Sequence, residues 1–187
     1  IDVGANCGYY TTLAASLVGP TGRIFAFEPS PIASQVIEEM IKDSNLQNVL
    51  LTKAAVGRAT GNTSLFLPTT RNLHSPSILQ SDPDFVPVPV PVVALDHFAP
   101  LEKVPKIKLV KIDVEGYEPD VLAGMERIVK EKRIENIICE FNSGWLKRNS
   151  ITPAQLYERF INLGYQVRMQ TMLEENVNRS DGEHWSL

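Results

Sequence analysis

The chain has 187 residues, of which 43% are hydrophobic and 21% charged, a balance typical of one globular domain with a full core. Its formal net charge is −4 and it has no run of lysine or arginine, which argues against general nucleic-acid binding. No apolar stretch reaches the roughly 18 residues of a membrane helix, so we expect no membrane segment, and we expect a cytoplasmic protein.

The chain opens inside an apolar strand, without a turn or a start methionine before Ile1. We therefore interpret residues 1–187 as a single domain truncated at its N-terminus, in which an upstream anchor or targeting segment would not be visible. No internal repeat divides this domain.

The N-terminal part of the chain predicts alternating strands and helices. Apolar runs at residues 1–3 and 23–28 predict two strands, and residues 9–18 between them predict a helix. Ser30 as N-cap and Pro31 at the first helical position begin a second helix. The apolar face of this second helix follows a helical period: Ile32, Val36, Ile37, Met40 and Ile41.

Turn residues and prolines mark the middle of the chain. Residues 49–56 predict a third strand, and residues 63–68 predict a short, antiparallel one. Residues 68–85 are rich in Ser, Thr, Asn and Pro and predict a long loop, which in compact domains tends to be functional or mobile. Prolines alternate in VPVPVPVV at residues 86–93. Because proline cannot donate to a ladder, an edge strand or polyproline-like connector is expected, and we favour an extended strand over a proline-motif ligand.

Strand and helix alternate again in the C-terminal half. Residues 94–102 predict a short helix with Asp96 as its cap, and residues 107–116 a strongly apolar strand that ends in acids. A helix that starts at Pro119 follows, with this apolar face: Val121, Leu122, Met125, Ile128 and Val129. The later elements are a strand at 134–141, a helix opened by a capping box at 152–155, and a strand at 165–171. The polar tail, residues 172–187, gives no clear element.

Repeated strand–helix units with nearly continuous apolar strands predict an α/β fold. We expect a Rossmann-like, doubly wound and mostly parallel sheet with helices on both faces. Ligands of such sheets bind beyond the carboxyl ends of the strands. This rule gathers the segments that follow the strands around one crevice: residues 2–8, Glu28, 54–57, 113–118 and 140–142.

The glycine loop after the first strand predicts a nucleoside pocket. Gly4 and Gly8 supply a tight turn, and the amides of residues 5–9 are expected to face the ligand at a helix N-terminus. Glu28, 20 positions after Gly8, is placed to accept hydrogen bonds from ribose hydroxyls. The loop lacks the middle glycine of the dinucleotide pattern, and a carboxylate at Asp2 would repel a phosphate. The cofactor that fits is S-adenosylmethionine, which has a ribose and a cationic sulfur but no phosphate.

Three segments, IDVGANCGYYT, FAFEPSP and LVKIDVEGYEPDVLAGM, with VVALDHF as a weaker fourth, resemble the FkbM-like methyltransferases. These form a branch of the S-adenosylmethionine-dependent Rossmann-type enzymes, and the resemblance covers residues 1–171. It implies methyl transfer, usually to a hydroxyl oxygen of a sugar, glycolipid or small natural product. The first loop would hold the methionine end of the cofactor, Glu28 the ribose, and the region after the third strand the adenine. The cofactor-binding residues are then expected to be Asp2, Gly4, Ala5, Asn6, Gly8, Tyr9, Glu28, Pro29, Ala55 and Asp113.

Methyl transfer to a neutral alcohol needs a base or a metal to remove the proton. We expect Asp113 to be the catalytic residue nearest the methyl group, with Glu115 next, although Glu115 and Glu118 also suit the capping of the helix at Pro119. Asp113, Glu140 and Asn142 form either an all-oxygen, magnesium-type site or a hydrogen-bonded shell around the substrate. We assign no metal ligand.

The sequence leaves two other functions open. One is a nicotinamide-dependent oxidoreductase on the same fold, which the missing glycine and Asp2 disfavour. The other is a non-catalytic module that binds a partner through its proline segment, which the intact glycine loop and acids disfavour. The expected partner is a small-molecule or glycan hydroxyl acceptor.

Overall fold

The computed structural model describes the following residues: 1–19, 21–69, 76–79, 84–171 and 184–186. The strands of the central sheet are β1 (Asp2–Val3), β2 (Ile24–Phe27), β3 (Val49–Thr52), β7 (Val110–Ile112), β8 (Ile137–Asn142), β9 (Gln170–Thr171) and β10 (His184–Ser186). The strands of a second sheet are β4 (Ala55–Val56), β5 (Gly61–Pro68) and β6 (Phe85–Val93). The helices are α1 (Tyr9–Val18), α2 (Pro31–Asp43), the 3-10 turn η1 (Leu95–His97), α3 (Ala99–Glu102), α4 (Glu118–Ala123), α5 (Glu126–Lys130), α6 (Ser143–Arg148) and α7 (Pro153–Asn162).

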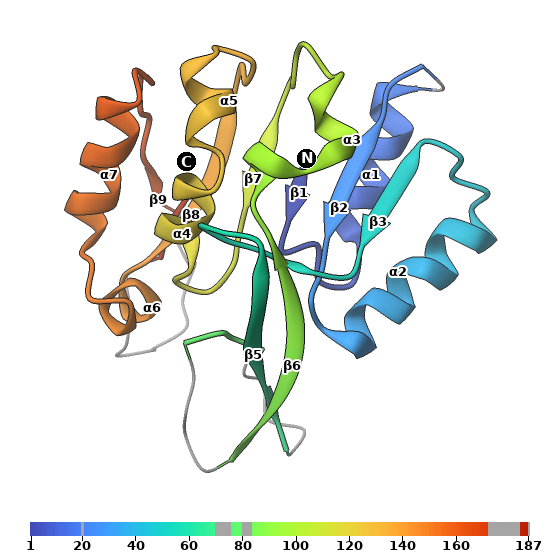
Figure 1. Cartoon of the computed structure of the whole chain (residues 1–187), viewed down its shortest axis with the longest axis horizontal. Helices are drawn as coiled ribbons and strands as arrows, with labels where there is room; N and C mark the ends of the chain where they lie inside the picture. The colour runs from blue at the N-terminus through green and yellow to red at the C-terminus, as the bar shows by residue number, and fades with distance from the viewer. Residues whose placement is uncertain (20, 70–75, 80–83, 172–183, 187) are drawn as a thin grey trace.

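The central sheet has seven strands in the order β3-β2-β1-β7-β8-β10-β9 (Figure 1). Its neighbours β3, β2, β1, β7 and β8 are parallel, and β10 runs antiparallel between β8 and β9. The predicted α/β fold with a mostly parallel sheet is therefore confirmed. Strands β2 and β3 lie on one side of β1, and β7 and β8 lie on the other. The loops after β1 and β7 therefore leave the same edge of the sheet side by side, as expected at a topological switch point.

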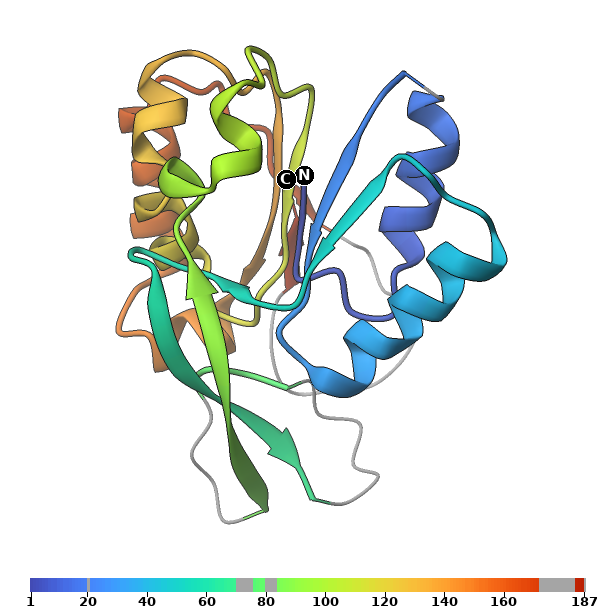
Figure 2. The ribbon, with the colours of Figure 1, turned by 45° about the vertical axis from the view of Figure 1, so that its right-hand side comes forward.

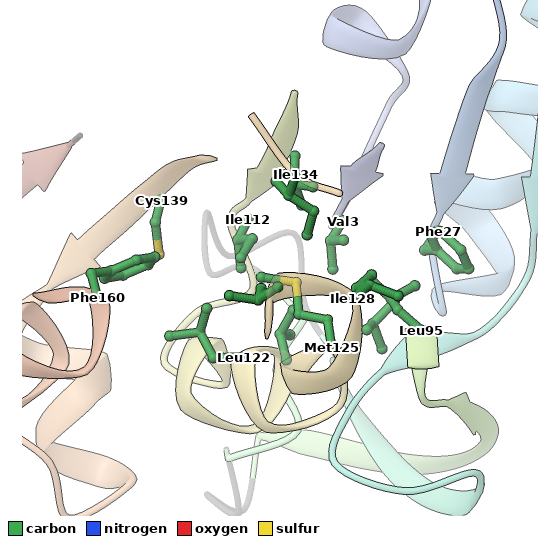
Figure 3. Packing of buried hydrophobic residues seen from close by; sticks show 14 of the residues in the cluster. Val3, Phe27, Leu95, Ile112, Leu122, Met125, Ile128, Ile134, Cys139 and Phe160 are labelled. Atoms are coloured by element: carbon green, nitrogen blue, oxygen red, sulfur yellow. The ribbon is translucent and has the colours of Figure 1, made fainter. Parts of the chain in front are cut away.

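Helices cover both faces of the sheet, as predicted (Figures 1 and 2). The alternation along β2 divides the core, because Phe25 and Phe27 join the larger hydrophobic cluster and Ala26 the smaller one. The larger cluster packs side chains of β1 and β7 against α4 and α5, with Val3, Ile112 and Met125 close together (Figure 3). The smaller cluster lies on the side of α1 and α2.

The predicted apolar face of α2 is confirmed in part. Ser30 caps this helix as expected, accepting from the amide of Ala33 at 3.4 Å. On the predicted face, Ile37 is buried and Met40 and Ile41 are partly buried, whereas Ile32 and Val36 are exposed. The physical reason is that α2 touches the sheet through one stripe, in which Ile37 and Ile41 pack with the small residues Ala5 and Ala26.

The predicted strand at residues 49–56 is divided between two sheets. Residues 49–52 form β3, whereas Ala55 and Val56 leave the central sheet and pair in parallel with Val92 and Val93 of β6. Local sequence could not predict this division, because the whole segment is apolar and its partner lies far along the chain.

Strands β5 and β6 form a long antiparallel arm that projects beyond the body of the protein (Figure 2). The antiparallel strand expected at 63–68 is thus confirmed and extended. The alternating prolines of β6 lie opposite Phe66, Ser64 and Asn62. Because proline has no N–H, the valines between them must carry the ladder to β5, and the missing donors face the opposite edge. The segment is an extended strand, as expected. Strand β4 pairs only with Val92 and Val93, so among the described residues the opposite edge of 85–91 pairs with no strand, and the expected edge strand is confirmed for this part of β6.

The helix predicted from Pro119 is interrupted at Gly124. Its five predicted apolar residues are all buried, which confirms the assigned face. Two short helices, α4 and α5, replace one, and the chain between them passes close to the backbone of Gly57: a Cβ on Gly124 would lie 2.0 Å from the Gly57 oxygen. Asp96 was expected to cap its own helix, but it accepts from the amides of Arg127 at 2.8 Å and Ile128 at 3.0 Å, and so caps α5.

In the C-terminal part, the predicted helix is confirmed, whereas the strands differ from the prediction. The capping box of Thr152 and Gln155 opens α7 as predicted. The strand expected at 165–171 is reduced to Gln170–Thr171, and the polar tail supplies β10, which its sequence does not announce. Within the described ranges, no helix has the length and apolar character needed to cross a membrane.

We predict that Gly124→Ala destabilises the protein by at least about 2 kcal/mol, because the new methyl group would overlap the Gly57 carbonyl. The free energy of unfolding, measured in urea, tests this. Gly61→Ala is the matched control, since a Cβ there meets no atom within 4 Å, and it should change that free energy little. Equal effects of the two substitutions would contradict the role assigned to the close contact.

Candidate functional site

The loop after β1 crosses closely over the end of β7. Gly4 has a φ of +77°, and a Cβ there would lie only 1.9 Å from the carbonyl oxygen of Asp113. Gly8 also has a positive φ, of +83°, where the loop turns into α1. Only glycine fits the conformation and the contact at position 4, so this residue sets how near the two strand ends approach.

The loop amides are largely used within the protein. The amide of Ala5 donates to the oxygen of Phe27 at 3.1 Å, that of Asn6 to Oε2 of Glu28 at 2.7 Å, and that of Gly8 to the oxygen of Ala5 at 2.8 Å. The expectation that the amides of residues 5–9 face the ligand is therefore wrong for these three. A ligand that needs several free backbone donors, such as a diphosphate, is poorly served here.

Glu28 fastens the loop to the tip of β2. Its Oε2 accepts from Asn6 and its Oε1 from the amide of Ser30 at 2.8 Å, and the residue is 6% exposed. Burial raises the pKa of Glu28 above its usual value, while these two hydrogen bonds act in the opposite direction. Each carboxylate oxygen can accept more than one hydrogen bond, so Glu28 retains acceptor capacity toward the pocket that it lines.

Lys111 links two acids and the glycine loop. Its Nζ lies 3.3 Å from Oδ1 of Asp2 and 3.3 Å from Oδ2 of Asp113, and it donates to the carbonyl oxygen of Gly4 at 3.0 Å. Asp2 also accepts from the hydroxyl of Thr11 at 2.6 Å. Asp2 is buried beneath the loop and its charge is compensated by Lys111, whereas the side chain of Asp113 is 42% exposed.

The acidic loop after β7 has an unusual backbone that the protein holds from several sides. Glu115 and Gly116 both have positive φ, +53° and +92°. The carboxylate oxygen Oε1 of Glu118 accepts from the amides of Val114 and Gly116, both at 3.2 Å. Asn149 donates to the Gly116 oxygen at 3.0 Å from the other side. The carboxyl group of Glu118 therefore fixes this loop through Oε1.

Acids accumulate at the ends of β7 and β8. Ile112 and Cys139 are paired, so Asp113 and Glu140, which follow them, lie side by side and share a hydrogen bond. Burial raises the pKa of Glu140 to about 8, and the neighbouring acids push it in the same direction. Burial likewise raises the pKa of Glu118 to about 7. Glu118 and Glu140 therefore bind a proton more readily than an ordinary glutamate does.

Asn142, the third member of the oxygen cluster considered for a metal, is used within the protein. The Oδ1 of Asn142 accepts from the amides of Gly144 at 3.1 Å and Trp145 at 3.3 Å and so caps α6. Among the residues that the structure describes, no group of three or more His, Cys, Asp or Glu side chains is arranged to hold a metal.

A pocket opens at this edge of the sheet. Its walls come from the tips of β1, β2, β4 and β7 and from the β5–β6 arm: Val3, Gly4, Asn6, Phe27, Glu28, Pro29, Ser30, Ala33, 54–56, Leu65, 76–78, 113–115 and Tyr117. The predicted site residues in its lining are Gly4, Asn6, Glu28, Pro29, Ala55, Asp113 and Glu115. Four others lie outside it: Asp2 and Ala5, which are buried, Gly8, and Tyr9, which is 65% exposed.

Some lining residues have little sequence signal. Residues 76–78 lie in the segment expected to be a long loop of functional or mobile character, although no local pattern singles them out within it. Leu65 has no local signal, because it reaches the pocket only through the pairing of β5 with distant strands. Tyr117 lies within residues 113–118, which the rule that ligands bind beyond strand ends places at the crevice, so this rule could have predicted it.

A family model described as the methyltransferase FkbM domain matches residues 2–167. The chain is similar to Methyltransferase 1 of Beauveria bassiana, with 30% identity over an alignment of 147 residues, and the match covers 67% of this chain and 57% of that protein. It is also similar to the hexuronic acid methyltransferase AglP of Haloferax volcanii, with 25% identity over 143 residues, 76% of this chain and 55% of that protein. The chain thus spans little more than half the length of these relatives.

Solved structures share the fold at low sequence identity. The FkbM methyltransferase of Methylobacillus flagellatus aligns with a TM-score of 0.61 and 15% identity over 99% of this chain and 42% of that one. The precorrin-6y C5,15-methyltransferase of Geobacter metallireducens aligns with a TM-score of 0.54 and 17% identity, over 99% of this chain and 75% of that one. These likenesses show a Rossmann-like architecture.

We predict that Glu118→Gln makes stability less dependent on pH. Because the pKa of Glu118 is raised to about 7 in the folded state, the folded protein binds this proton more tightly than the unfolded chain does. The free energy of unfolding should therefore fall as pH rises from about 4.5 to about 7, by on the order of 2 kcal/mol, and then stay level. Glutamine resembles the protonated acid and should remove this fall.

Urea denaturation at pH 5 and pH 8 measures the effect. Glu102→Gln, at the exposed end of α3, is the control and should keep the fall seen in the parent protein. If Glu118→Gln kept the same fall as the parent, the carboxyl would not be the buried, protonated group described above.

Proposed function

Because the chain belongs to the FkbM methyltransferase domain family, we propose that it binds S-adenosylmethionine in the pocket at the carboxyl edge of the central sheet and methylates a hydroxyl oxygen. The observation that carries this proposal is that the family match includes every wall of the pocket, from Val3 to Tyr117. The acceptor that we propose is a sugar, a glycolipid or a small natural product.

The chemistry of the pocket suits a cationic adenosine compound without phosphate. Its polar lining is acidic, with the carboxylates of Glu28, Asp113 and Glu115, and a sulfonium is stabilised near such groups. The amides of Ala5 and Asn6 are engaged within the protein, so the loop has few donors left for a diphosphate. Both features favour S-adenosylmethionine over a nicotinamide dinucleotide.

Two parts of the pocket have separate tasks in this proposal. Glu28 accepts hydrogen bonds from the ribose hydroxyls with the acceptor capacity that Asn6 and Ser30 leave free. Gly4 brings the loop against the end of β7, so that the cofactor and the acids of the next loop lie in one space. The bound cofactor supplies an electrophilic methyl carbon.

Asp113 is the residue that we assign to the proton of the acceptor hydroxyl, with Glu115 beside it. Asp113 lines the pocket and is held by Lys111 at 3.3 Å, so its carboxylate has a fixed position. It accepts the hydroxyl proton at a carboxylate oxygen while the acceptor oxygen is aligned for displacement. The name of the Haloferax volcanii relative, a hexuronic acid methyltransferase, supports a sugar as acceptor.

We predict that Glu28→Ala weakens binding of S-adenosylhomocysteine about a hundredfold, because two hydrogen bonds to a charged acceptor are lost. Isothermal titration calorimetry measures this, with the melting temperature as the check on folding. Glu38→Ala removes an exposed carboxylate of α2 and should leave the affinity unchanged. The parent protein should bind S-adenosylhomocysteine and not NAD. Binding of NAD alone would overturn the proposed function, and unchanged affinity in Glu28→Ala would remove the ribose contact.

We predict that Asp113→Asn largely spares cofactor affinity but slows turnover by about 10²- to 10³-fold, because the amide cannot accept the hydroxyl proton. The assay follows a mass gain of one methyl group across a panel of sugars, hexuronic acids and other hydroxylated acceptors. Asp43→Asn, at the exposed end of α2, should keep full turnover. Full turnover of Asp113→Asn would shift the assignment of the base to another group.

A further inference from the structure

Asp113 and Glu140 occupy corresponding positions at the tips of two neighbouring parallel strands. Ile112 of β7 pairs with Cys139 of β8, so the residues that follow them lie side by side, on strands about 4.8 Å apart. The amide of Asp113 still donates to the oxygen of Val3 at 3.2 Å, so the line of β7 continues to this residue. Ile112 and Cys139 both belong to the larger hydrophobic cluster (Figure 3). Because side chains alternate along a strand, Asp113 and Glu140 project from the opposite face, where they share a hydrogen bond.

The charges around this pair are arranged unevenly. Two adjacent carboxylates repel each other, so a proton bound between them is favoured. Lys111 lies 3.3 Å from Oδ2 of Asp113, and a neighbouring cation favours the ionised form of that carboxyl. Glu140 is half-buried, and Glu115 and Glu118 are further acids that act on it. Burial and these acids raise the pKa of Glu140 to about 8, so the arrangement favours the proton on Glu140 and the charge on Asp113.

We propose that Glu140 is a positioning residue for Asp113, in which the carboxyl proton of Glu140 donates a hydrogen bond to the Asp113 carboxylate and holds it at the pocket together with Lys111. The proposal rests on the proposed function, in which Asp113 accepts the proton of the acceptor hydroxyl. Among the described residues that line the pocket, Asp113 is included and Glu140 is not, so Glu140 acts through Asp113. A carboxylate has about four acceptor sites, so these two contacts leave Asp113 free to meet a hydroxyl.

This hydrogen bond depends on pH. As the pH rises through about 8, Glu140 loses its proton, and the donor to Asp113 is replaced by a second negative charge. Asp113 is then repelled instead of held, and turnover should fall. Glutamine at position 140 would keep a donor and cannot ionise. Of the other groups near Glu140, Glu118 has a pKa of about 7 and is present in both proteins, and Ser186, opposite on β10, does not titrate.

The first test is the pH dependence of kcat in the parent protein and in Glu140→Gln. Between pH 7 and pH 9.5 the parent should lose roughly fivefold to tenfold in kcat, the effect of one hydrogen bond to a charged group, and Glu140→Gln should stay level. Glu140→Ala lacks the donor at every pH and should be about tenfold slower than the parent at pH 7. Glu158→Gln, at an exposed position of α7, is the control and should reproduce the parent profile.

The second test needs no acceptor. Carbon-13 NMR of the glutamate carboxyl groups follows the titration of Glu140, whose signal is identified by its absence in Glu140→Gln. In Asp113→Asn the pKa of Glu140 should fall by about one pH unit, because the neighbouring negative charge is gone. Asp43→Asn makes the same substitution at the exposed end of α2 and should leave this pKa unchanged. An equal pKa in the parent and in Asp113→Asn would overturn the proposal.

The outcomes also separate this proposal from the proposed function. If the parent transferred no methyl group to any acceptor, the proposed function would fail, and the NMR titration would still decide whether the two carboxyls are coupled. If the parent were active and its pH profile matched that of Glu140→Gln, or if Glu140→Ala kept full kcat, the function would stand and the positioning role would be overturned. Melting temperatures verify that each variant is folded.

Discussion

The geometry of this site depends on the ion pairs and the hydrogen bond that Lys111 makes. Its ammonium group lies between Asp2 of β1 and Asp113 at the end of β7, and it also donates to the carbonyl oxygen of Gly4. Without this cation, Asp2 would be a buried carboxylate with the hydroxyl of Thr11 as its remaining partner, which is costly in a protein interior. Lys111 thus stabilises the crossing of the glycine loop over β7 and holds Asp113 at the pocket with the same contacts.

Glu118 and Glu140, two other carboxyls of the site, would repel Asp113 if all three were ionised. Glu118 fixes the loop from within, and Glu140 lies beside Asp113 at the tip of the next strand. Burial raises the pKa of both, to about 7 for Glu118 and about 8 for Glu140, so near neutral pH they add less negative charge than ordinary glutamates would. The repulsion between like charges at the tips of β7 and β8 is reduced accordingly.

The fold was largely readable from sequence, and the pocket only in part. Apolar runs, the Ser30 cap and the Thr152 capping box are local signals, and each marks an element that the structure contains. The rule that ligands bind at the carboxyl ends of parallel strands also selected Gly4, Glu28 and Asp113, which line the pocket. What local patterns could not predict is set by contacts between distant residues. Asp96 caps α5 and not its own helix, residues 49–56 divide between two sheets, and β10 forms from a polar tail.

The base of the arm shows how these distant contacts act on the site. The amide of Gly57, where the arm leaves the body, donates to the oxygen of Val93, where it returns. Gly124 packs against Gly57, and its own oxygen accepts from the amide of Asp96 at 2.9 Å. Both ends of the arm are thus anchored at the junction of α4 and α5, and α4 carries Glu118, which brackets the acidic loop. The β5–β6 arm, which lines part of the pocket, and the acidic loop are consequently both held by the junction of α4 and α5. A shift of these helices at Gly124 would therefore move both.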